Sequence, residues 1–324
     1  TTVWIRSARL GMVKIGQGST ATDNLILIDL GKKGIAATPD SALYNGSFVL
    51  RGNDGTFGGA SGTTTTLLTW SSAIRGHESF DTSRRNHVLY ETPTLYGFTL
   101  QAAVAEDNFW DIALRYAGEF HGFRFAGGIG YQEDSEFNAP STGLAAGANS
   151  VSCINDCDVT SKEIKGAASI LHVATGLFLT GAGGQRELSG ERIAGDPTSN
   201  YAGPDLTWWY LSGGLSRNFF GIGNTVLFGE YLDSKGGLEQ AGFLATNANG
   251  YMSNTAALGR TSSEAQMWGI GINQYIDAAA MELFITYKNY SLDASGFVGT
   301  PTLNKDSGGV SDFSTVIVGT KINF

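Results

Sequence analysis

The chain has 324 residues, 42% of them apolar, and a formal net charge of −9. Its mean hydropathy of −0.05 and the absence of any apolar run of about 18 residues exclude a transmembrane helix. The basic residues are scattered rather than clustered, which argues against nucleic acid as a partner. The 45 glycines, the 6 prolines and the many Tyr, Phe and Thr residues favour β-strands joined by loops.

The predicted elements are strands, because apolar and other side chains alternate with a period of two. In 110–118, for example, Trp110, Ile112 and Leu114 share one face while Asp111 and Arg115 share the other. In chain order the predicted strands are 3–7, 11–17, 85–92, 98–106, 110–118, 122–132, 165–173, 177–185, 206–216, 224–232, 266–275, 281–290 and 312–324. We interpret residues 1–324 as one domain.

The connections alternate between short turns and longer polar loops, and the strands are about ten residues long. Both features are typical of a transmembrane antiparallel β-barrel, with short turns at one rim and long loops at the other. Aromatic side chains at strand ends, namely Tyr131, Tyr231, Tyr275 and Tyr290, suit the membrane interfaces of such a barrel. The alternative is a soluble β-sandwich, whose strands also alternate but are shorter.

Several segments resemble known bacterial proteins. The final segment, DFSTVIVGTKINF, resembles the closing strand and terminal aromatic residue of bacterial outer-membrane proteins. The segments LGMVKIGQGSTATD, SRRNHVLYETPTLYGFTL and DIALRYAGEFHGFRFAGGIGY resemble the trimeric general (diffusion) porins of Gram-negative bacteria, particularly an alphaproteobacterial type, and the likeness extends over essentially the whole chain. It implies a homotrimer in the outer membrane, in contact with lipid and lipopolysaccharide, through which small hydrophilic solutes and ions diffuse passively.

The resemblance also implies a strand count. The family's barrel has about 16 strands, and the segment RRNHVLYETP matches its sixth, so about 13 strands are expected here. We therefore expect that three N-terminal strands exist but are not in this sequence, or that a different chain segment closes the barrel. An open edge in hydrocarbon is costly because its backbone groups find no hydrogen-bond partner.

By the same resemblance, residues 19–83 are the pore-constricting loop that folds into the lumen. Acids of the loop are then expected to face bases on the wall and to create a transverse field that acts on polar solutes. The acidic candidates are Asp23, Asp29, Asp40 and Asp54. Strand alternation points the basic candidates inward: Arg6, Lys14, Arg85, His87, Arg115 and Arg124. The alternative for each base is an ordinary solvated lumen residue, and for each acid an exposed turn residue.

The only two cysteines, Cys153 and Cys157, lie four residues apart in a polar stretch. We predict a small loop disulfide between them, as an oxidising compartment permits. The weaker alternative is a Ca²⁺ site at Asp156 and Asp158, because that cation prefers oxygen ligands. No other cofactor or metal is expected.

Enzyme chemistry is not expected, because the sequence holds no nucleophile elbow, zinc-binding, Walker A or dinucleotide-binding motif. The four histidines lie far apart, and His121 falls in a predicted tight turn. Two alternatives to a general diffusion channel stay open. One is a substrate-selective channel, and the other is a structural or adhesive surface barrel of little conductance that works through outer loops such as 233–264.

Overall fold

The computed structural model describes residues 1–53, 55, 69–76, 78–135, 159–191, 200–202, 205–243, 262–295 and 309–322. All thirteen predicted strands are confirmed, with one three-residue strand in addition. The strands are β1 (Thr2–Ser7), β2 (Gly11–Gly18), β3 (Arg85–Glu91), β4 (Phe98–Ala105), β5 (Phe109–Phe120), β6 (Phe123–Asp134), β7 (Val159–His172), β8 (Leu177–Glu191), β9 (Asn200–Ala202), β10 (Leu206–Arg217), β11 (Thr225–Lys235), β12 (Ser262–Ile276), β13 (Met281–Ser295) and β14 (Phe313–Ile322).

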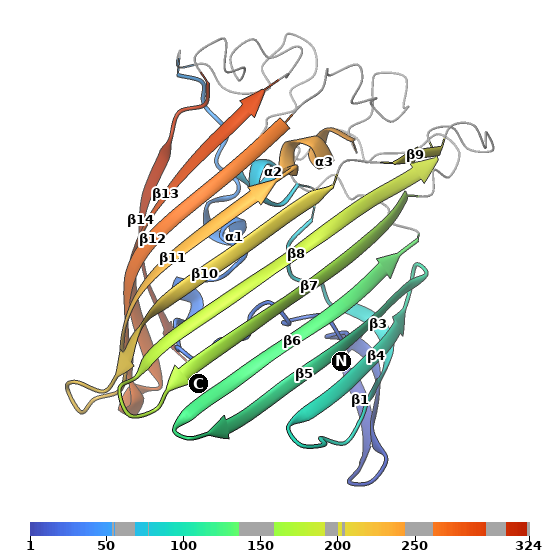
Figure 1. Cartoon of the computed structure of the whole chain (residues 1–324), viewed down its shortest axis with the longest axis vertical. Helices are drawn as coiled ribbons and strands as arrows, with labels where there is room; N and C mark the ends of the chain where they lie inside the picture. The colour runs from blue at the N-terminus through green and yellow to red at the C-terminus, as the bar shows by residue number, and fades with distance from the viewer. Residues whose placement is uncertain are drawn as a thin grey trace.

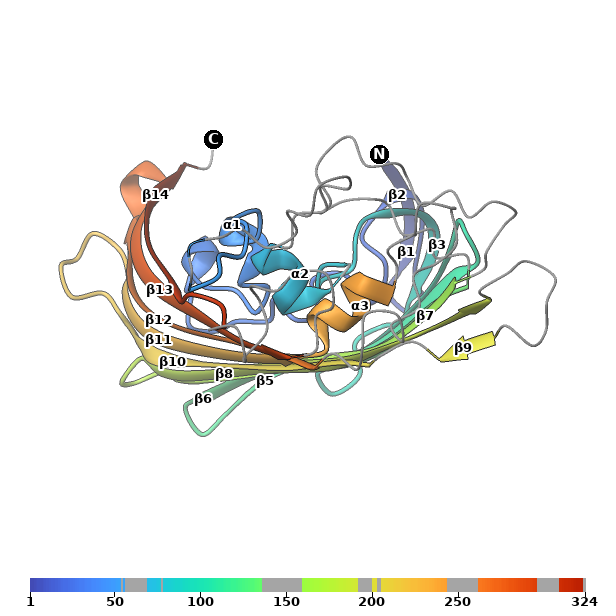
Figure 2. The same ribbon diagram turned by 90° about the horizontal axis from the view of Figure 1, so that it is seen from above.

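The strands form one antiparallel sheet in which each pairs with the next along the chain, while β9 pairs only with the end of β8. The sheet is strongly curved, and Figure 2 shows it from above as a trough that is open between β1 and β14. Within the part of the chain that the structure describes, no ladder joins these two strands. The predicted all-β class is therefore confirmed as a sheet of the barrel type that is not closed.

The two faces of the sheet differ as the alternation predicts. The outer face is apolar and exposed, with Leu114, Ile129, Leu179, Ile270 and Ile285 among the side chains that it presents. Their neighbours along each strand point into the trough and include most of the charged residues of the strands. A hydrocarbon environment suits the first face and water or polar protein suits the second.

The two rims also differ. Short connections lie together at one rim, such as the turn at His121 and Gly122 and the 3-10 turn η3 (Asp277–Ala279). The strand ends that the long connections join lie at the other rim (Figure 1). His121 is exposed, as expected, and both turn residues have positive φ angles of 49° and 78°. Glycine has no Cβ to oppose such a conformation, so it is suited to so tight a turn.

Apart from η3 at the rim, the helical elements lie inside the trough (Figure 2). Three of them, η1 (Gly34–Ala36), α1 (Ala42–Asn45) and α2 (Trp70–Arg75), belong to residues 19–84, which we call the inner segment. A fourth, α3 (Gly237–Phe243), follows β11. None of the helices in the described ranges is long and apolar enough to cross a membrane.

The α3 helix changes the interpretation of residues 233–264, which we had expected to form one long outer loop. Strand β11 continues to Lys235, β12 already begins at Ser262, and α3 turns into the trough between them. Extra strand residues such as Ser234 and Ser263 are polar, which is why the sequence pattern did not place them in strands.

Among the described residues, the largest apolar core lies between the inner segment and the wall. It joins Trp70, Ile74 and Leu50 of the inner segment to wall residues such as Tyr210 and Tyr290, all of them nearly or fully buried. Packing inside the trough therefore holds the inner segment on the sheet, while the apolar side chains of the outer face are exposed.

We expect a charge to be tolerated only on the inner face. In lipid vesicles, Leu100→Lys on the outer face of β4 should lower the free energy of unfolding by about 2 kcal/mol, because an ammonium group has to leave water for hydrocarbon. The control is Thr99→Lys, which places the same charge on the adjacent, inward position. Urea titration of both variants checks this, and an equal loss in the two would contradict the assignment of the faces.

Candidate functional site

The inner segment passes across the inner wall twice. The first pass starts at the end of β2, runs past β5 to β8 and reaches β12 and β13. The second pass returns through α2 to the start of β3 (Figures 1 and 2). The contacts along both passes are mainly between wall side chains and backbone groups of the segment. They define the candidate constriction of a channel.

Both passes are anchored at one place on β5 and β6. Asp111 accepts hydrogen bonds from the backbone N–H groups of Ala21 and Thr22 at 3.1 and 2.8 Å. The Oε1 atom of Gln132 lies 2.9 Å from the Thr22 hydroxyl and 2.6 Å from the Thr82 hydroxyl. Residues 60 positions apart in the chain are thus held by two neighbouring wall side chains.

Two of the predicted wall bases bind carbonyl groups at the start of the first pass. Arg115 on β5 donates to the carbonyls of Ala21 and Asp23 at 2.9 and 2.8 Å. Lys14 on β2 donates to the carbonyl of Ser19 at 2.7 Å. These bases point inward, as the alternation predicts, and they fix the backbone of the segment.

The carboxylates of Asp29 and Asp40 are paired within the inner segment itself. Asp29 accepts hydrogen bonds from the ammonium and backbone N–H of Lys33 at 2.7 and 2.9 Å. Burial raises the pKa of Asp29, but Lys33 and the N–H of Gly31 outweigh it and hold the pKa below its usual range. Asp40 pairs with Arg75 of α2 at 2.8 Å. We expected these two acids to face bases on the wall, but each pairs with a base of the inner segment instead. The segment folds back on itself, which brings these bases close.

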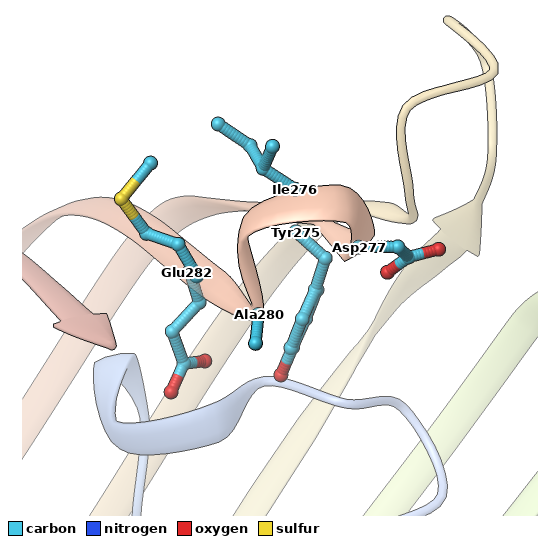
Figure 3. Close-up of a pocket in the computed structure, with 6 residues that line it drawn as sticks. Tyr275, Ile276, Asp277, Ala280 and Glu282 are labelled. Atoms are coloured by element: carbon cyan, nitrogen blue, oxygen red, sulfur yellow. The ribbon is translucent and has the colours of Figure 1, made fainter. Parts of the chain in front are cut away.

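The first pass is held at its far end by the last residues of β12 and the first of β13. Figure 3 shows Tyr275 and Glu282 directed toward the ribbon of the inner segment, beside a pocket of about 180 Å³. The Tyr275 hydroxyl donates to the carbonyl of Lys32 at 3.0 Å, and Asn273 donates to the carbonyl of Lys33 at 3.1 Å. The pocket therefore lies at the rim of short turns, beside the residues that hold Lys32 and Lys33 of the inner segment.

A buried charge cluster holds the second pass. Glu163 on β7 lies 3.2 Å from Lys165 and 3.3 Å from Arg186 of β8, and all three side chains are at most 1% exposed. Lys165 also donates to the carbonyl of Phe80 at 2.9 Å, and Arg186 donates to that of Ser79 at 2.8 Å. The two cations and the carboxylate thus contact each other, and both cations also donate to backbone carbonyls, which offsets much of the cost of burying their charge.

The remaining basic candidates have separate surroundings. Arg85 pairs with Asp134 at 2.7 Å, and its guanidinium carbon lies 4.3 Å from the centre of the Phe109 ring. His87 is buried, with its Nδ1 atom 2.9 Å from the carbonyl of Arg85. Arg6 pairs with Glu91 at 3.3 Å on the margin of the sheet. Arg124 pairs with Glu119 at 2.8 Å beside the rim of short turns, and both side chains are about half exposed.

Asp81 is a residue that the sequence analysis did not select. Its Oδ1 atom accepts hydrogen bonds from the N–H groups of Asn24 and Thr82, at 2.8 and 3.1 Å. Burial and the nearby Asp23 raise its pKa to about 6, against the lowering effect of Lys165. The available signal was its place as the last acid before β3, where the chain has to return to the wall.

Some predictions fall outside the described residues. Asp54 is one of them, as are the cysteines of the predicted disulfide, Cys153 and Cys157, and the acids of the alternative Ca²⁺ site, Asp156 and Asp158. Within the described ranges, no group of three or more His, Cys, Asp or Glu residues is arranged to hold a metal ion. The disulfide, the Ca²⁺ site and the constriction roles stay predictions.

No protein-family model and no curated protein sequence matches the chain. Among solved structures it is similar to an anion-selective porin from Comamonas acidovorans, with 14% identity, a TM-score of 0.56, and coverage of 100% of this chain and 77% of that one. Weaker similarities are to the outer-membrane protein OmpT of Vibrio cholerae, with 13% identity, a TM-score of 0.48 and 99% and 79% coverage, and to OccD3 of Pseudomonas aeruginosa, with 12% identity, a TM-score of 0.43 and 75% and 58% coverage. The first similarity shows that the chain has the fold of an outer-membrane porin barrel.

The buried cluster on β7 and β8 should be much more sensitive to loss of a carboxylate than the exposed pair near the rim. Glu163→Gln leaves two buried cations without their counter-ion and should lower the free energy of unfolding by about 3 kcal/mol. The matched control is Glu119→Gln, which should cost about 0–1 kcal/mol because water solvates Arg124. Urea unfolding in lipid vesicles measures both, and equal effects would show that the cluster is not buried.

Proposed function

We propose that the chain forms the wall and constriction of an outer-membrane channel through which small hydrophilic solutes and ions diffuse passively. The observation that carries the proposal is a charged inner face with a long segment bound along it, on a sheet whose other face is apolar. A water-filled passage needs the first face and a lipid bilayer needs the second. The porin fold supports this reading, and the outer membrane is the location we propose.

A channel also needs a closed wall. The outward backbone groups of β1 and β14 have no ladder partner among the described strands, and hydrocarbon cannot satisfy them. We propose that in the functional barrel these edges pair with strands that the fourteen-stranded sheet does not include. A homotrimer and contact with lipopolysaccharide rest on the sequence resemblance alone and are part of the proposal.

Size and charge at the constriction would select the solutes. The inner segment narrows the lumen, and Asp23 and Asp81 lie on it close to the wall bases Arg115 and Lys165. Fixed charges of opposite sign in one narrow section create a field that orients polar solutes. No bound cofactor or energy source enters this scheme.

The proposal predicts ohmic single-channel currents in planar bilayers. Arg85→Ala should shift the reversal potential in a salt gradient toward cations, because it leaves Asp134 without its 2.7 Å partner. Arg124→Ala is the control, since this side chain lies in water near the rim of short turns. Bilayers that stay silent after confirmed insertion would refute the open channel and favour a structural or adhesive barrel.

The channel should also change its selectivity near pH 6. Asp81 has a pKa of about 6, so acidification through that value protonates it and removes one negative charge from the constriction. The charged groups that act on it are Asp23 of the same segment, Lys165 on β7 and Arg115 on β5. Reversal potentials between pH 5 and pH 7 should therefore move toward anions at the acidic end.

The control for this pH step is a pair of substitutions. Asp81→Asn should abolish the step, because the amide does not titrate in this range. Asp107→Asn, at an exposed turn between β4 and β5, should leave the step unchanged. A step that persists in Asp81→Asn would assign the titration to a different group.

A further inference from the structure

The α3 helix reaches the interior of the trough from a different connection than the inner segment does. It begins directly after β11 at the rim of long connections, and it lies beside α2 inside the sheet (Figures 1 and 2). A second, independent part of the chain therefore contacts the element that makes the second pass.

The two helices approach each other so closely that only glycine fits at the contact. A Cβ atom at Gly237 would lie 2.1 Å from the carbonyl oxygen of Ala73 in α2. A Cβ atom at Gly76, which caps α2 with a φ of 66°, would lie 3.0 Å from the Cβ atom of Gln240. Contacts of this kind transmit a displacement of one helix directly to the other.

The wall holds α3 through apolar and polar contacts. Leu238 is 1% exposed and belongs to the same core as Ala73 and Ile74. Glu239 accepts a hydrogen bond from the N–H of Ser263 on β12 at 2.6 Å, and Gln240 donates to the carbonyl of Arg186 at 3.0 Å. The position of α3 is thus set by β8 and β12.

The contact extends through α2 to the first pass of the inner segment. The hydroxyl of Ser234 donates to the carbonyl of Ile74, and Arg186 donates to that of Arg75 at 3.2 Å. The side chain of Arg75 in turn pairs with Asp40 at 2.8 Å. A chain of direct contacts therefore joins α3, α2 and the first pass.

We propose that residues 237–240 of α3 are a positioning element of the constriction, which holds α2 against the wall and so fixes the width of the channel. This inference rests on the proposed function, because it assigns a role within the same channel. The residues bind no solute themselves; they act through α2. The constriction is then built from two connections rather than from the inner segment alone.

The test compares two glycine-to-alanine variants. Gly237→Ala adds a carbon against the Ala73 carbonyl and should displace α2, so the channel should lose its steady conductance level and flicker between sub-levels. Gly229→Ala on β11 makes the same change where the nearest atom to the added carbon is 3.9 Å away, and it should conduct as the parent does. The parent and both variants should unfold at the same temperature on gels. A changed current would then reflect a displaced α2 and not loss of the folded sheet.

Limited trypsin digestion in lipid vesicles gives a readout that does not depend on current. The Arg75 side chain is 23% exposed and paired, so the parent should resist cleavage after Arg75, whereas Gly237→Ala should be cut there. Leu238→Ala, which removes the buried contact without adding an atom, should also be cut. The inference would be overturned if Gly237→Ala and Leu238→Ala both conducted steadily and both stayed uncut after Arg75. A parent protein without current would overturn the proposed function instead, and the digestion would then still test the contact between α3 and α2.

Discussion

Every backbone polar group that crosses a lipid bilayer must find a partner inside the protein, and this constraint orders the rest of the structure. A sheet meets it between neighbouring strands, but it then has two faces and each strand contributes to both. The outer face has to be apolar, so the charged residues of the strands collect on the inner one. Residues such as Asp111, Glu163 and Arg186 are consequently concentrated in the trough, where something must satisfy them.

The backbone of the inner segment provides many of the hydrogen-bond partners of these charged wall side chains. Carbonyls of residues 79 and 80 accept hydrogen bonds from Arg186 and Lys165, and N–H groups of residues 21 and 22 donate to Asp111. Because backbone groups carry no charge, they satisfy wall ions without cancelling the charge pattern of the wall. The segment is therefore held along the sheet by hydrogen bonds that leave the charges of the wall in place.

Much of this fold could be predicted from the sequence, because alternation with a period of two survives in every central strand segment. The strand ends were less predictable. Strand β7 begins at Val159 rather than near 165, because polar residues such as Thr160 and Glu163 occupy both of its faces there. Strand β13 continues to Ser295 rather than ending near 290, where Ser291 and Asp293 interrupt the face that is apolar earlier in the strand. Alternation also gave the inward direction of Arg85 and Lys14. It could not give the partner of Arg85, because Asp134 lies 49 positions away in the chain. Nor could it give the contact of Asp81 with Asn24, which joins residues 57 positions apart and depends on how the inner segment crosses the wall.

In the proposed channel, the same contacts would decide which acids act on a passing ion. Asp29 and Asp40 are neutralised over less than 3 Å by Lys33 and Arg75 of their own segment, so their fields fall off quickly with distance. Asp23 and Asp81 lie near each other instead, and burial together with the nearby Asp23 raises the pKa of Asp81. The net charge of −9 is thus a poor guide to selectivity. Selectivity in the proposed channel depends instead on a few charges of the inner segment, such as Asp23 and Asp81. The opposite charges that act on them, Arg115 and Lys165, belong to the wall and not to the segment itself.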